Sequence, residues 1–123
     1  MADGLVLVVE DNEKNMKLFR DVLQASGFAT LEAASAEEGI ELAVANQPGL
    51  VLMDVQLPGI DGVEALARLR ADERTAAIPV LALTAQAMRG DRERFIEAGF
   101  DGYLSKPVDV LELIDAVKGH CIP

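Results

Sequence analysis

The sequence lacks several features that would point to other classes of protein. A single cysteine, Cys121, among 123 residues allows no intrachain disulfide and fits a reducing compartment. Only 11 basic side chains accompany 21 acidic ones, and the net charge of -10 argues against a nucleic-acid surface or an anionic membrane face. Apolar runs reach only about five residues, so we expect neither a membrane span nor a signal peptide. These absences favour a soluble cytoplasmic protein, and the length suits one domain, 1–123.

Short apolar runs alternate with segments of helical spacing along the chain. This alternation predicts a (βα)5 chain, in which right-handed crossovers lay helices on both faces of a parallel sheet. The more mixed second and fifth runs belong at the edges, which favours the flavodoxin-like, doubly wound strand order 2-1-3-4-5. The predicted strands are Leu5 to Val9, Phe28 to Ala33, Leu50 to Met53, Val80 to Leu83 and Gly102 to Leu104.

Acidic side chains follow the first and third of these strands. Glu10 and Asp11 end the first, Asp54 ends the third, and the two strands flank the crevice where such sheets bind ligands. Because crowded carboxylates raise each other's pKa unless a cation neutralises them, the cluster predicts a Mg²⁺ site. Taken singly, Asp11 or Asn12 could instead cap the first helix, and Asp54 could cap a turn.

A hydroxyl and an ammonium group follow the last two strands. Thr84 ends the fourth strand and Lys106 follows the fifth, on the side of the crevice opposite the acids. Such donors suit the equatorial oxygens of a phosphoryl group, with Asp54 as the attacking carboxylate that becomes an aspartyl phosphate. Helix capping by Thr84 and a solvated Lys106 are the structural alternatives.

Four motifs occur in order at the ends of four of the predicted strands. They are Val9-Glu10-Asp11-Asn12, Met53-Asp54-Val55-Gln56-Leu57-Pro58-Gly59-Ile60-Asp61-Gly62, Leu83-Thr84-Ala85 and Ser105-Lys106-Pro107. The set resembles the response-regulator receiver domains of bacterial two-component systems, and the resemblance spans essentially the whole chain. Within that family, residues 10–18 and Gln56 are most similar to single-domain regulators of cell division and polar differentiation.

The resemblance implies a role for each matching position. Asp54 would accept a phosphoryl group from the phosphohistidine of a sensor histidine kinase or histidine phosphotransfer protein. Mg²⁺ would be held by Glu10, Asp11, Asp54 and the main-chain carbonyl of Gln56. Thr84 and Lys106 would bind phosphoryl oxygens, and the Lys106–Pro107 bond resembles the family's cis peptide.

The same resemblance implies a conformational switch. Tyr103 matches an aromatic residue that turns inward when Thr84 moves toward the phosphate, and its structural alternative is an ordinary edge-strand aromatic. The face that responds would comprise the fourth helix, fifth strand and fifth helix, residues 88–98, 102–104 and 108–118. Met88, Arg89, Arg92 and Phe95 could dock a downstream protein target there, although a solvated helix with Phe95 in the core fits equally well.

Other functions stay open at this point. We expect no enzymatic activity beyond self-phosphorylation and autodephosphorylation. We also expect no output domain, although the chain could derive from a longer regulator or hybrid histidine kinase. A magnesium phosphatase with an aspartyl intermediate would need a general acid near Asp54, where Gln56 is an amide, and a substrate cap. A flavodoxin-like cofactor binder would want Ser, Thr or Gly after the first strand, where this chain has Glu10-Asp11-Asn12.

Overall fold

The structure, a computed structural model, describes residues 2–57, 60, 62–85 and 91–121. Five parallel strands form one sheet in the order β2-β1-β3-β4-β5, as the sequence predicts. Every predicted strand is present, with ends that differ by up to three residues. The strands are β1 (Ala2–Val9), β2 (Ala29–Ala33), β3 (Pro48–Asp54), β4 (Val80–Thr84) and β5 (Gly102–Ser105).

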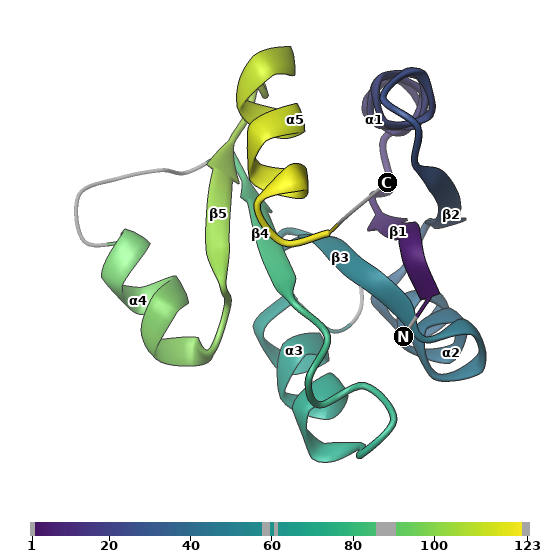
Figure 1. Cartoon of the computed structure of the whole chain (residues 1–123). Coiled ribbons are helices and arrows are strands. Elements are labelled where there is room, and N and C mark those ends of the chain that lie inside the picture. The colour runs from purple at the N-terminus through teal and green to yellow at the C-terminus, as the bar shows by residue number, and fades with distance from the viewer. Residues whose placement is uncertain (1, 58–59, 61, 86–90, 122–123) are drawn as a thin grey trace.

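Helices cover the sheet on both faces (Figure 1). One face packs against α1 (Glu13–Ala25) and α5 (Val110–Lys118). The other packs against α2 (Ala36–Asn46), α3 (Gly62–Ala71) and α4 (Asp91–Ala98). The helix predicted from residue 88 is described only from Asp91, because 86–90 lie outside the described residues. None of the helices in the described ranges combines the length and hydrophobicity that a bilayer crossing requires.

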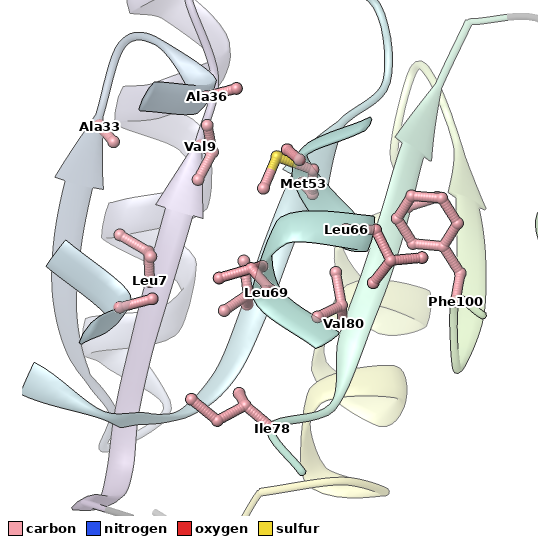
Figure 2. Packing of buried hydrophobic residues seen from close by; sticks show 14 of the residues in the cluster. Leu7, Val9, Ala33, Ala36, Met53, Leu66, Leu69, Ile78, Val80 and Phe100 are labelled. Carbon is pink, nitrogen blue, oxygen red and sulfur yellow. The ribbon is translucent and has the colours of Figure 1, made fainter. Parts of the chain in front are cut away.

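The alternation of side chains along the strands separates two hydrophobic cores. In β1, Val6 and Val8 face α1 and α5, whereas Leu7 and Val9 face α2 and α3. Figure 2 shows the second of these clusters, with Leu7, Val9 and Met53 facing the residues of the covering helices. The same alternation continues to the strand ends, where it decides which polar side chains share a face.

The central strands are buried along their length, and the edge strands are not. β3 and β4 are buried at every residue, whereas β2 and β5 are mixed, as expected for edge positions. Gly27 and Gly99 follow the ends of α1 and α4 with φ of 94° and 108°, a left-handed conformation that favours glycine. These turns return the chain to the sheet for β2 and β5.

Candidate functional site

Glu10 and Asp54 lie side by side at the carboxyl end of the sheet. The register pairs Val8 with Leu52 and Val9 with Met53, so one further step brings Glu10 next to Asp54. Both side chains share the face of α1 and α5, and the two residues are only 1% and 3% exposed. The structure thus brings these two predicted residues together and buries them.

Lys106 connects the two buried acids. Its Nζ donates to Glu10 Oε1 and Oε2, both at 2.9 Å, and to Asp54 Oδ2 at 2.8 Å. The Lys106 backbone N–H donates to Thr84 O at 2.7 Å, and its peptide bond to Pro107 is cis, as the resemblance implies. A solvated Lys106, the structural alternative, is therefore wrong.

The pKa values of the two acids shift in opposite directions, although both acids contact Lys106. Burial raises the pKa of Glu10 to about 7, and the neighbouring Asp54 adds to the increase, while bonds from Asn15 and Lys106 act against it. Burial also acts to raise the pKa of Asp54, but hydrogen bonds from Glu10, Lys106 and the Gln56 backbone outweigh it and leave the pKa below its usual value. Burial would lower the pKa of Lys106, but its bonds to Asp54 and Glu10 raise it. Because two carboxyl groups lie beside one ammonium group, the raised pKa of Glu10 makes this carboxyl group easier to protonate than an exposed glutamate.

Asp11 completes a cluster that fits a hard cation. Ligand oxygens of Glu10, Asp11 and Asp54 all lie within 4.8 Å of one another, and Asp11 is exposed at the rim. Opposite ligands of an octahedral Mg²⁺ lie about 4.2 Å apart, so small side-chain movements would let these oxygens share one ion. Asn12, not Asp11, caps α1, which leaves the Asp11 carboxylate free of that task.

Thr84 ends β4 in a buried position next to the strand of Asp54. The Val55 N–H donates to Leu83 O at 3.0 Å, which joins the segment after Asp54 to the end of β4. The Gln56 N–H donates to Asp54 Oδ1 at 2.8 Å, whereas its side chain is exposed. Thr84 and Gln56 also line a cavity of about 310 Å³ that extends toward α3 and α4.

The predicted docking face is only partly as expected. Phe95 is 1% exposed, so of the two alternatives the structure selects the core position and not the docking surface, because α4 turns this residue toward Phe100 and the sheet. Tyr103 is partly buried on the same side, and its ring centroid is 6.3 Å from that of Phe95. Met88 and Arg89 lie outside the described residues, as does the side chain of Arg92.

Sequence reasoning missed one contact at the site. Asn15, in the first turn of α1, donates from Nδ2 to Glu10 Oε1 at 2.8 Å. The five-residue separation from Glu10 across the start of the helix was the available signal. A polar residue at the helix start also suits solvent or capping, so the spacing alone does not single out this bond.

Comparisons with known proteins agree with the geometry. The family model for the response regulator receiver domain matches residues 6–118. The chain is 47% identical over 115 residues to the polar-differentiation response regulator DivK of Brucella ovis, covering 94% of each protein.

Solved structures show the same architecture. The receiver domain of the sensor histidine kinase PA1611 from Pseudomonas aeruginosa, crystallised with magnesium in its active-site cleft, is 34% identical with a TM-score of 0.88, over 97% of this chain and 98% of that one. The Vibrio cholerae chemotaxis protein CheY4, at 24% identity, shares the fold with a TM-score of 0.89, over 97% of this chain and 99% of that one. The chain therefore belongs to the response regulator receiver domain family.

Proposed function

We propose that this chain is a single-domain response regulator that accepts a phosphoryl group on Asp54 in the presence of Mg²⁺. The observation that carries the proposal is the contact between Lys106 Nζ and Asp54 Oδ2, 2.8 Å long, within a cluster of three acidic side chains. The similarity to DivK and to a receiver domain that binds magnesium supports the same function.

The transfer would exchange one bond to phosphorus for another. A carboxylate oxygen of Asp54 attacks the phosphorus of a phosphohistidine, the P–N bond breaks, and its electron pair returns to the imidazole, which takes up a proton. The depressed pKa of Asp54 keeps this nucleophile ionised at neutral pH. The donor is a sensor histidine kinase or a histidine phosphotransfer protein.

The remaining residues of the site would hold Mg²⁺ and bind the phosphoryl oxygens. Glu10, Asp11, Asp54 and the Gln56 carbonyl would hold Mg²⁺, which neutralises the charge that develops on the transferred oxygens. Lys106 already donates to Asp54, so it can follow the new phosphoryl oxygens with a small movement. Thr84 would bind a further oxygen from the end of β4. The chain would catalyse its own phosphorylation and dephosphorylation and would turn over no other substrate.

A partner-binding face would then respond to phosphorylation. The added charge of roughly 1.5 to 2 units draws Thr84 and Lys106 toward it, and β5 follows because the Lys106 N–H is bonded to Thr84 O. Tyr103, partly buried beside Phe95, is the side chain that would change position. A downstream protein would read the face formed by α4, β5 and α5.

Phosphorylation of the isolated protein tests the proposal. Incubation with acetyl phosphate and Mg²⁺ should add one group of about 80 Da, seen by intact mass spectrometry. EDTA and Asp54→Asn should each abolish the added mass, whereas Asp21→Asn, which changes an exposed aspartate of α1, should not. Persistence of the mass in Asp54→Asn would overturn the choice of Asp54, and sustained hydrolysis of small phosphomonoesters would favour the phosphatase instead.

A further inference from the structure

The first turn of α1 contacts the site through one neutral side chain. Asn15 is partly buried, and its Nδ2 donates to Glu10 Oε1 at 2.8 Å. We propose that Asn15 is a positioning residue for magnesium, which acts by holding the Glu10 carboxylate in the orientation that the metal needs. This inference rests on the magnesium site of the proposed function.

Both ends of this contact are anchored by the backbone. Asn12 Oδ1 accepts from the backbone N–H groups of Lys14 and Asn15, at 3.0 and 3.1 Å, which fixes the first turn of the helix. On the other side, the Glu10 backbone N–H donates to Ala33 O of β2 at 3.0 Å. The amide of Asn15 therefore approaches Glu10 from a helix turn whose backbone is held by capping hydrogen bonds.

The charge of the donor explains why Asn15 differs from Lys106. Both donate to Glu10, but the ammonium group of Lys106 brings a positive charge that opposes a dication at the same carboxylate. Asn15 hydrogen-bonds the ionised carboxylate and leaves its negative charge available. Groups that orient metal ligands in this way are a general feature of metal sites.

The movement of Lys106 makes the contact more important. Lys106 Nζ bonds both oxygens of Glu10 before phosphorylation, and it must release them at least in part to follow the phosphoryl group. Once it does, Oε1 retains the bond from Asn15, whereas Oε2 loses the bond that Lys106 makes to it. Asn15 thus holds Glu10 in place when its cationic partner withdraws.

Replacement of Asn15 by leucine tests this role. Asn15→Leu keeps a similar volume and removes the donor, and we expect its Mg²⁺ affinity to fall about tenfold, as for other residues that support metal ligands. Gln24→Leu is the matched control, because Gln24 Nε2 also donates from α1 to another element, Thr30 Oγ1, at 2.9 Å but far from the acids. Magnesium dissociation constants are measured by titration followed by amide NMR shifts, with thermal unfolding in EDTA as the check of folding.

A second readout separates positioning from general disruption. The phosphorylation rate with acetyl phosphate is measured across Mg²⁺ concentrations, where Asn15→Leu should raise the half-saturating concentration about tenfold and change the plateau by less than about twofold. A helix that is merely destabilised would lower the plateau instead. If leucine prevents folding, Asn15→Ala provides the same comparison with a good helix former.

The outcomes distinguish this inference from the function on which it rests. If the wild type binds Mg²⁺ and Asn15→Leu or Asn15→Ala binds it as tightly as Gln24→Leu does, the positioning role is wrong and the proposed function stands. A plateau that falls while the half-saturating concentration stays constant also overturns it. If the wild-type chain binds no Mg²⁺, both the proposed magnesium site and the role of Asn15 are wrong.

Discussion

Lys106 is the residue on which three carboxylate oxygens converge. Its Nζ contacts both oxygens of Glu10 and one of Asp54, and its side chain is 18% exposed. Buried acids are tolerated because this cation and several hydrogen bonds compensate for the loss of hydration. The same side chain is a candidate ligand for the phosphoryl group, so one residue stabilises the resting site and takes part in its chemistry.

Removal of this cation should destabilise the metal-free protein. Lys106→Met leaves two nearly inaccessible carboxylates facing each other, and we expect a loss of about 2–3 kcal/mol in the free energy of unfolding, measured with urea in EDTA. Millimolar Mg²⁺ should recover part of this loss by supplying the missing charge. Arg20→Met is the control, since its pair with Glu32 is about one-third exposed and should contribute less than about 1 kcal/mol. Equal losses in the two variants would contradict this account of the site.

The proton on Glu10 should make metal-free stability depend on pH. Because folding raises the pKa of Glu10 from 4.5 to about 7, its contribution to stability is complete below pH 4.5 and is lost as the pH rises through 7. The lowered pKa of Asp54 acts only at more acidic pH. In EDTA, the wild type should therefore lose stability relative to Glu10→Gln between about pH 5 and pH 8. A difference between the two proteins that stays constant across this range would show that Glu10 does not hold the proton.

At the scale of the elements, the site depends on how closely α2 and β1 approach. Gly39 of α2 lies against Val9, the residue before Glu10, and a Cβ at Gly39 would be 2.7 Å from Val9 Cγ2. Valine cannot turn aside easily, since it is branched at Cβ and fully buried. The small residue in α2 therefore sets the separation between this helix and the strand that presents Glu10.

Substitution of this glycine should reveal the contact. Gly39→Ala should destabilise the protein by about 1–3 kcal/mol, although alanine favours helices by about 1 kcal/mol over glycine. Urea unfolding should show that Val9→Ala, combined with Gly39→Ala, costs less than the sum of the two single changes, because the smaller side chain relieves the overlap. Simple additivity would mean that α2 adjusts without pressing on β1.

At the scale of the whole molecule, Arg70 connects three parts of the chain near the far end of the sheet. From the last turn of α3 it donates to Ile78 O at 2.6 Å, ahead of β4, and to Gly99 O at 3.2 Å, after α4. It also pairs with Asp101 Oδ2 at 2.9 Å, and the same oxygen accepts from the Val80 N–H at 2.8 Å. The planar guanidinium group of Arg70 therefore joins α3 to the starts of β4 and β5.

A lysine cannot reproduce this set of bonds. Arg70→Lys retains the charge but loses the forked geometry, and we expect a loss of about 2 kcal/mol in urea unfolding. Hydrogen exchange at the Val80 amide should become faster in this variant. Arg68→Lys, two residues away in the same helix, changes an exposed pair with Glu64 at 3.6 Å and should have an effect of less than about 0.5 kcal/mol. If Arg70→Lys matches that control, the network contributes little to stability.

The sequence by itself determined the order of the elements, the strand topology and the acids at the strand ends. These follow from local patterns: continuous apolar runs make buried strands, helical spacing makes the covering layers, and parallel strands bring their carboxyl ends to one edge. Glu10, Asp11 and Asp54 could be grouped in advance for this reason.

Only the tertiary structure decided which side chains share protons and contacts at that edge. Lys106 lies 96 residues from Glu10 and 52 from Asp54, and its contacts depend on side-chain geometry that no local pattern encodes. The buried position of Phe95 and the bond from Asn15 to Glu10 depend likewise on how helices pack against the sheet. Periodicity specifies that a helix has a buried face, but close packing of the assembled side chains decides which atoms meet there.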